Sequence, residues 1–303
     1  MGQAPLLRRC LAAISTRSAR GIRMRVSQRG TPNRPRWLPH HVHRTPMEVA
    51  MPIANINGHR HHWEARGAGD PLVLVHGAAT SGMMLLPHFD ELSKSFHVII
   101  PDLRGMGGSE HVSSIEPSAW VDDLAGLLNH LGIDSAHCYG VSLGARVVLR
   151  LAVDHPARVR SLILDAPIVA NDSAGNAQLN SFMTIDNISP ERRAAYEKEH
   201  GADWATVLRN YFNIRNDPAV QEYLNLRQLC AGVQAPTLLL RGDRDEPVHP
   251  LAHAVELLQR MPNARLAVLP KTTTAVAMAA PLKFHALLRD FVKDVVTTPS
   301  AAG

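Results

Sequence analysis

Acidic residues are missing from the first 47 positions of this chain of 303 residues, a stretch that contains ten arginines. The remainder holds 22 of the 32 basic residues and all 27 acidic residues, a formal net charge of −5. The sequence pI of about 9.4 therefore comes from one end of the chain. Binding to a nucleic-acid backbone needs Lys and Arg clustered on the folded surface, so this distribution argues against a nucleic-acid partner.

The chain also has few cysteines and no long apolar run. Cys10, Cys138 and Cys230 are scattered and lack the spacing of metal ligands, which argues against a disulfide framework and indicates a reducing compartment. No run of 18 apolar residues occurs, so no membrane span is expected. The glycines at 105–108 lack the strand-to-helix setting of a dinucleotide or phosphate loop. We therefore expect no cofactor and no metal, and a small molecule as the partner.

Residues 1–47 form an Arg-rich segment that we exclude from the fold. The segment resembles a mitochondrial targeting sequence, because it is rich in Arg, contains Ser and Ala, and lacks acids. The alternative is an extension upstream of the functional start, which would then lie at Met24, Met47 or Met51 rather than Met1. A cytoplasmic location follows from the second interpretation and a mitochondrial one from the first. The oligomeric state is left open.

Short apolar runs alternate with amphipathic stretches through residues 48–303, which predicts one α/β domain. The expected fold is a mostly parallel sheet of about eight strands with helices on both faces. It begins with a hairpin at 53–63, whose Asn57-Gly58 pair favours a type I′ turn. Its last helix carries an apolar face at 284–295 with helical spacing. Further strands are expected at 72–75, 98–100, 136–139, 161–164, 237–240 and 265–269.

The alternation stops between about 168 and 232, in a stretch too long for a plain loop. We expect a small helical lid there, over the strand ends where ligands of open α/β sheets bind. An aromatic-rich lid favours an apolar or aromatic ligand, although the same residues would also serve as the lid's own core. Its aromatic residues are Phe182, Tyr196, Trp204, Tyr211, Phe212 and Tyr223.

The segment 140–144 has the sequence Gly-Val-Ser-Leu-Gly, which follows an apolar strand and opens a helical pattern. This G-x-S-x-G arrangement predicts a nucleophile elbow, a strained turn that lifts Ser142 clear of the sheet. The N-terminus of the following helix points at the serine, so the amide of Leu143 is expected to donate to an oxyanion. The apolar run 72–75 followed by His76-Gly77 predicts the loop that completes the oxyanion hole.

Together these motifs resemble the α/β-hydrolase superfamily, in the branch of small lidded esterases, lactone hydrolases and C–C bond hydrolases. The resemblance covers about residues 53–296 and includes the loop Pro101–Ser109. It implies Ser142 as the nucleophile and the amides of Ala78 and Leu143 as the oxyanion donors. It also implies Asp245 as the acid that orients a catalytic histidine.

The chain departs from this family where the catalytic histidine belongs, because Thr274 occupies that position. Threonine cannot accept a proton near neutral pH, so Ser142 would lose its general base. Loss of that histidine typically costs about a millionfold in turnover. The sequence therefore predicts impaired serine chemistry that Thr274→His would raise at least about a hundredfold, the usual lower range of general-base catalysis. His249, which follows Asp245 on the same loop, is the alternative base.

Three functions remain open from the sequence. The first is a hydrolase of a small carboxylic ester or lactone with impaired or unorthodox serine chemistry. The second is a non-catalytic pseudoenzyme that binds a small apolar ligand or a protein partner. The third is a lyase or isomerase that uses the oxyanion hole to stabilise an enolate. The fold alone does not decide among them.

Overall fold

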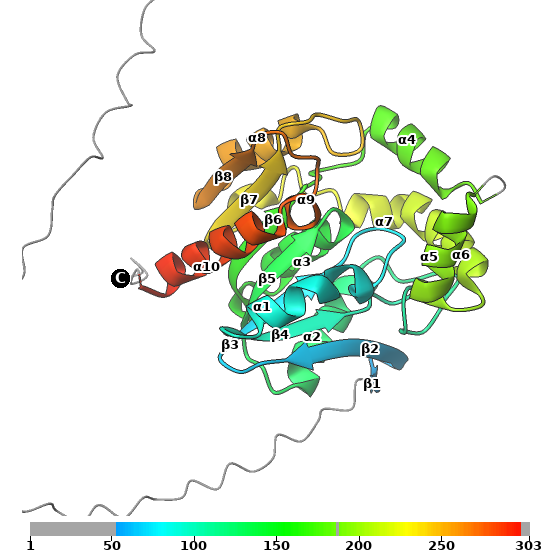
Figure 1. The fold of residues 1–303 in the computed structure, drawn as a ribbon, viewed down its shortest axis with the longest axis horizontal. Helices are drawn as coiled ribbons and strands as arrows, with labels where there is room; N and C mark the ends of the chain where they lie inside the picture. Colours follow the sequence, from blue (N-terminus) through cyan, green and yellow to red (C-terminus); the bar gives the residue numbers. More distant parts are fainter. Residues whose placement is uncertain (1–52, 186–187, 298–303) are drawn as a thin grey trace, which may run out of the picture. The chain divides into compact units, whose positions relative to one another are not determined.

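The computed structural model describes residues 53–185 and 188–297, so the predicted leader at 1–47 lies outside the described residues. Eight strands form one sheet with the order β1-β2-β4-β3-β5-β6-β7-β8 (Figure 1). The strands are β1 (Ile53–Ile56), β2 (His59–Arg66), β3 (Asp70–Val75), β4 (Phe96–Pro101), β5 (Ala136–Val141), β6 (Val159–Asp165), β7 (Thr237–Gly242) and β8 (Ala264–Leu269). The predicted α/β class and the approximate number of strands are confirmed.

The sheet is parallel except at one edge. β3 to β8 pair in parallel with their neighbours, whereas β2 runs antiparallel to both β1 and β4. β1 and β2 form the predicted hairpin, in which Asn57 and Gly58 have φ angles of 53° and 85°. Both angles are positive, as a type I′ turn requires.

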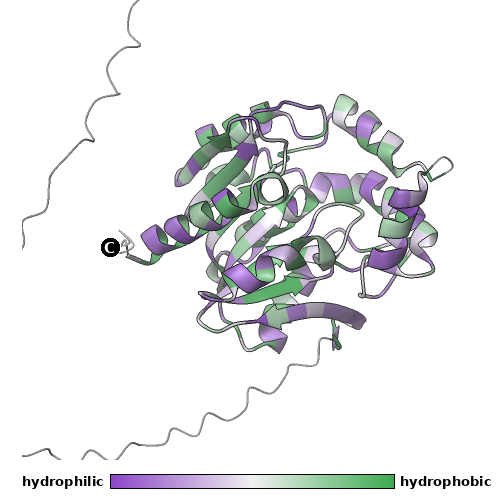
Figure 2. Ribbon diagram, viewed as in Figure 1, coloured by the Kyte–Doolittle hydropathy of each residue, from purple (hydrophilic) through white to green (hydrophobic). Residues whose placement is uncertain are grey.

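Helices cover both faces of the sheet because its central strands are apolar on both sides. Val73 and Val75 pack with α2 and α3, whereas Leu72 and Leu74 pack with α1 and α10. Figure 2 shows the hydrophobic colour along the central strands and both colours along α10, as expected for an amphipathic helix. The covering helices are α1 (Phe89–Leu92), α2 (Ala119–His130), α3 (Leu143–Asp154), α8 (Leu251–Arg260), α9 (Val276–Ala279) and α10 (Pro281–Thr297), with the short 3₁₀ helices η1 (Gly82–His88) and η2 (Pro156–Arg158).

A group of helices follows β6 and precedes β7 in the chain, at the position of the expected lid, and is called the lid below (Figure 1). Because it leaves the sheet at the carboxyl end of β6, it starts at the edge where the elbow also lies. Its elements are α4 (Ser173–Met183), α5 (Pro190–His200), α6 (Trp204–Asn216), α7 (Pro218–Tyr223) and the 3₁₀ helix η3 (Cys230–Gly232). None of the helices described here has the length and apolar character needed to cross a membrane.

Candidate active site

Ser142 occupies the turn between β5 and α3 in a strained conformation. Its φ and ψ angles are 55° and −112°, in a region that residues other than glycine rarely adopt. Such a conformation costs on the order of 1–3 kcal/mol and persists only where the surroundings impose it. Here the amide of Ser142 donates to the carbonyl of Asp165 at 3.0 Å, which ties the turn to the end of β6.

The two glycines of the motif allow the strand and the helix to approach each other closely. A Cβ atom on Gly140 would lie 2.3 Å from the backbone of Gly144, and one on Gly144 would lie 2.3 Å from the carbonyl oxygen of Val75. Real Cβ atoms essentially never come so near to another backbone. The glycines therefore place the N-terminus of α3 directly against β3 and β5, with Ser142 at the top of the turn.

Ala78 and Leu143, the residues predicted to form the oxyanion hole, line one cavity together with Ser142. Among the residues that the structure describes, neither of their amide N–H groups donates a hydrogen bond to the protein. Unpaired amides beside a nucleophile can stabilise a negative oxygen, and Leu143 adds the positive end of the α3 dipole. The structure thus brings all three residues to one place.

The loop after β7 brings an imidazole to the serine. His249 Nε2 lies 2.8 Å from Ser142 Oγ, and its Nδ1 lies 2.6 Å from Glu246 Oε1. An ionised carboxylate only accepts hydrogen bonds, so Nδ1 must carry the proton. In the neutral ring, Nε2 is then free to accept the hydrogen of the serine hydroxyl. This geometry can deprotonate Ser142 during nucleophilic attack.

Glu246, rather than Asp245, is the carboxylate that contacts this histidine. The hydrogen bond from His249 is the main cause that lowers the pKa of Glu246, to about 2, and the hydroxyl of Thr274 adds to it. Asp245 instead accepts a hydrogen bond from the amide of Leu251 at 2.7 Å, at the start of α8, and its side chain is 66% exposed. Glu246 therefore faces the imidazole of His249, whereas Asp245 binds the first amide of α8.

Thr274 also contacts this carboxylate. Its hydroxyl donates to Glu246 Oε1 at 2.7 Å, from the loop between β8 and α9. The expectation of impaired chemistry assumed that no imidazole lies beside Ser142. The structure places His249 there, so this assumption does not hold. The sequence contained one signal for this arrangement: Glu246 and His249 are three positions apart in a loop that follows a strand end.

A buried arginine fixes the backbone of the loop that carries this histidine. The Arg241 side chain is 1% exposed and donates to the carbonyl oxygens of Gly242 and His249. Burial lowers the pKa of Arg241. Because one side chain binds the loop at both its beginning and its end, the histidine is held over the serine by the core rather than by the loop alone.

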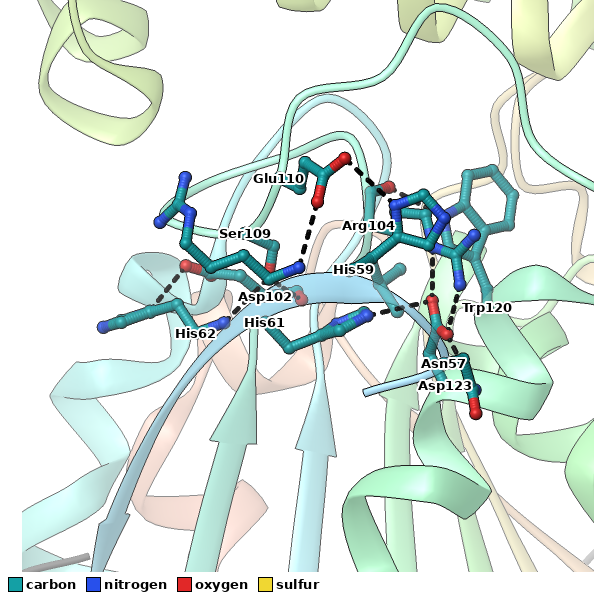
Figure 3. A network of polar contacts seen from close by, with 12 residues as sticks. Asn57, His59, His61, His62, Asp102, Arg104, Ser109, Glu110, Trp120 and Asp123 are labelled. Atoms are coloured by element: carbon teal, nitrogen blue, oxygen red, sulfur yellow. Dashed lines mark hydrogen bonds and ion pairs between the residues drawn. The ribbon is translucent and has the colours of Figure 1, made fainter. Parts of the chain in front are cut away.

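A polar network joins β2, α2 and the loop that follows β4 (Figure 3). Asp102 accepts hydrogen bonds from the amides of Gly82 and Gly108 and contacts His62 Nδ1 at 2.8 Å. Desolvation opposes the charge of Asp102, yet these hydrogen bonds keep its pKa below the usual value. His76 Nε2 accepts from the amide of Leu103 at 3.0 Å, and burial lowers its pKa. The histidine of the oxyanion loop thus holds backbone and does not reach the serine hydroxyl.

The cavity beside Ser142 extends to the lid helices, because Leu179, Tyr211 and Val220 are among its lining residues. Trp120 and Tyr211 are the aromatic residues among its lining. Tyr196 and Trp204 instead stack on each other within the lid, with ring centroids 6.1 Å apart. Most lid aromatics therefore lie away from this cavity, which weakens the argument from lid composition for an aromatic ligand.

Comparison with known proteins agrees with this architecture. A family model described as the alpha/beta hydrolase fold matches residues 70–188. The 2-hydroxymuconate semialdehyde hydrolase of Pseudomonas sp. (strain CF600) is 39% identical over 106 residues, which cover 32% of this chain and 36% of that protein. The soluble epoxide hydrolase of Corynebacterium sp. (strain C12) is 35% identical over 165 residues, or 53% of this chain and 54% of that protein. The chain matches only about a third to a half of the length of these two relatives.

Solved structures resemble the fold over a longer range. The meta-cleavage product hydrolase from Pseudomonas fluorescens IP01 has a TM-score of 0.67 at 20% identity, over 80% of this chain and 97% of that one. At this identity the likeness concerns the fold. The family model, the eight-stranded sheet and the strand-turn-helix around Ser142 together lead to one conclusion: the chain has the α/β-hydrolase fold.

Proposed function

We propose that this protein is a serine hydrolase of small carboxylic esters or lactones, with Ser142 as nucleophile, His249 as general base and Glu246 as the orienting acid. The observation that carries the proposal is the 2.8 Å contact between Ser142 Oγ and His249 Nε2, with Glu246 on the other ring nitrogen. Nucleophile, base and orienting acid in sequential contact are the geometric signature of such catalysis.

In this mechanism, Ser142 Oγ attacks the carbonyl carbon of the ester while His249 Nε2 accepts the hydroxyl proton. The carbonyl oxygen becomes an oxyanion, which the amides of Ala78 and Leu143 stabilise. Collapse of the tetrahedral intermediate breaks the bond to the alcohol, and His249 returns the proton to that leaving group. A water molecule then attacks the carbonyl carbon of the acyl-enzyme while its proton passes to His249. The bond between the acyl group and Ser142 Oγ breaks, His249 returns the proton to Ser142 Oγ, and the free acid leaves.

Two observations favour this proposal over the non-catalytic and the lyase or isomerase alternatives. The strained Ser142 backbone has little structural reason to persist without a reaction at the serine. An isomerase that only stabilises an enolate also has no need for a serine hydroxyl bonded to an imidazole. The relatives, whose names describe hydrolases, support the same choice.

Ser142→Ala is expected to abolish ester hydrolysis and covalent labelling by a fluorophosphonate. The wild type should be labelled because an activated hydroxyl displaces fluoride from phosphorus, whereas alanine has no nucleophile. The measurement is intact-protein mass spectrometry together with hydrolysis of p-nitrophenyl acetate. A wild-type protein that neither takes up the label nor exceeds the alanine variant in rate would contradict the proposal.

Thr274→Val is expected to lower kcat/KM about tenfold, because it removes a hydrogen bond to a charged group, worth about 1.5 kcal/mol. Valine keeps the shape of threonine, and Thr273→Val, at an exposed neighbouring position, is the matched control. With His249 already in contact with Ser142, we expect Thr274→His to lower the rate as well, against the expectation from sequence. A large gain in rate from that variant would show that His249 is not the working base.

A further inference from the structure

Two buried arginines line the cavity that contains Ser142. Arg146 lies on α3, about one turn after the serine, and Arg215 lies on the lid helix α6. They are 6% and 7% exposed. Among the residues that the structure describes, no acidic side chain lines this cavity, so the two arginines are the charged groups of its described lining.

Within residues 53–185 and 188–297, the hydrogen-bond partners of these arginine side chains are neutral oxygens. Arg146 donates to the carbonyl of Leu224 at 2.7 and 3.1 Å and to Asn171 Oδ1 at 3.0 Å. Arg215 donates to Asn176 Oδ1 at 2.8 Å, to Asn180 Oδ1 and to Asn216 Oδ1 at 3.4 Å. The ion pairs that arginines form within the described ranges involve neither of them. Amide and carbonyl oxygens thus orient both guanidinium groups without cancelling their charge.

Such an arrangement is costly in the absence of an anion. Burial lowers the pKa of Arg146 to about 10, with a contribution from Arg215 nearby, yet the group remains protonated at neutral pH. An ion removed from water without a partner of opposite charge loses hydration free energy that no other interaction replaces. A guanidinium has five N–H donors, so each arginine retains donors beyond those used by its neutral partners.

We infer that the two arginines recognise a free carboxylate on the substrate, so that the substrate of Ser142 is a small ester or lactone that also carries an acid group. This inference rests on the proposed serine hydrolase activity. The planar guanidinium matches a carboxylate in two parallel hydrogen bonds, which would supply the missing negative charge. Because the arginines and the serine line one cavity, a single small molecule can meet both.

A purely structural role makes a different prediction. Arg146 ties α3 to the end of the lid helix α7, and Arg215 joins the lid helices α6 and α4, so both arginines also hold the lid in place. If that were their only task, their replacement would reduce activity on charged and neutral esters by the same factor. The ratio between two such substrates separates the roles, since it does not depend on how much of a variant is folded.

The first experiment compares kcat/KM for monomethyl glutarate and dimethyl glutarate by titration of the released acid. These substrates share the reacting ester and differ in the free carboxylate. We expect the wild type to prefer the monoester at least tenfold, after allowance for the two esters of the neutral compound. Arg146→Gln and Arg215→Gln should each lower this preference at least tenfold, whereas Arg209→Gln, at an exposed position of α6, should retain it. No preference in the wild type, or equal losses on both substrates, would overturn the inference.

The second experiment measures binding without turnover. Glutarate is titrated into the Ser142→Ala variant by calorimetry, with Arg215→Gln or Arg209→Gln added in the same background. We expect glutarate to bind at least tenfold more weakly with Arg215→Gln and equally with Arg209→Gln. Absence of binding, or tighter binding of inorganic phosphate than of glutarate, would refute the carboxylate assignment. Arginine-dependent glutarate binding in a protein that cleaves no ester would instead support this site and reject the hydrolase proposal.

Discussion

His249→Gln is expected to lower kcat/KM for ester hydrolysis about a millionfold, to the level of Ser142→Ala. Triad members act as a unit, so removal of the base leaves the serine hydroxyl as unreactive as its absence would, at a cost of about 8 kcal/mol of barrier. Glutamine keeps a polar side chain in the loop and cannot accept the proton. The measurement is the initial rate with p-nitrophenyl acetate, corrected for spontaneous hydrolysis.

The matched control is His155→Gln, because this histidine is 38% exposed in its side chain and lies outside the cavity. It should retain wild-type activity. A smaller variant, His249→Ala, should regain part of its rate when free imidazole is added, since the added base can occupy the vacated space. Retention of more than about a hundredth of the activity in His249→Gln would exceed what the oxyanion hole and substrate binding usually leave, and would remove His249 from the mechanism.

Glu246→Gln is expected to lower kcat about ten-thousandfold, whereas Asp245→Asn should leave kcat within about twofold. The carboxylate holds the proton on His249 Nδ1, and an amide in its place can stabilise the opposite tautomer, which is inactive. The adjacent Asp245 provides the internal control because it has the same charge and faces α8 instead of the imidazole. Steady-state kinetics with one substrate compare the two variants directly.

The pH dependence provides a second check on this assignment. The pKa of Glu246 lies near 2, because its hydrogen bonds to His249 and Thr274 favour the charged form. A depressed carboxyl pKa means that the ionised acid persists above that value and is lost only as the pH falls through it. The pH profile of activity should therefore show no inflection between pH 5 and 8 that arises from the ionisation of Glu246. In the mutational test, loss of activity in Asp245→Asn but not in Glu246→Gln would instead identify Asp245 as the orienting acid, as the family pattern implied.

Local sequence patterns were sufficient to predict the elbow and the sheet. The glycines at 140 and 144 have to be small because the helix and strand backbones meet there, so the motif carries its own steric explanation. Alternating apolar runs identify buried parallel strands wherever both faces of a sheet are covered. The Asn57-Gly58 turn is likewise encoded by two neighbouring residues.

Local patterns could not predict which histidine and which carboxylate lie beside Ser142. The pattern of the family pointed to the loop after β8, where Thr274 lies, and to Asp245 after β7. The folded chain instead brings His249 to Ser142, 107 positions earlier in sequence, and turns Glu246 toward the imidazole. The directions of side chains in an irregular loop follow from its anchors, here Arg241 and the start of α8, and not from a repeating period.

The sequence by itself therefore determined the fold class, the hairpin and the strained turn at Ser142, because each depends on contacts between neighbours or on a regular apolar repeat. Only the tertiary structure decided which histidine and which carboxylate meet the serine, and that two arginines from different helices share its cavity. These outcomes depend on how loops and helices far apart in the chain pack together. Such packing is set by the whole core, which no local motif describes.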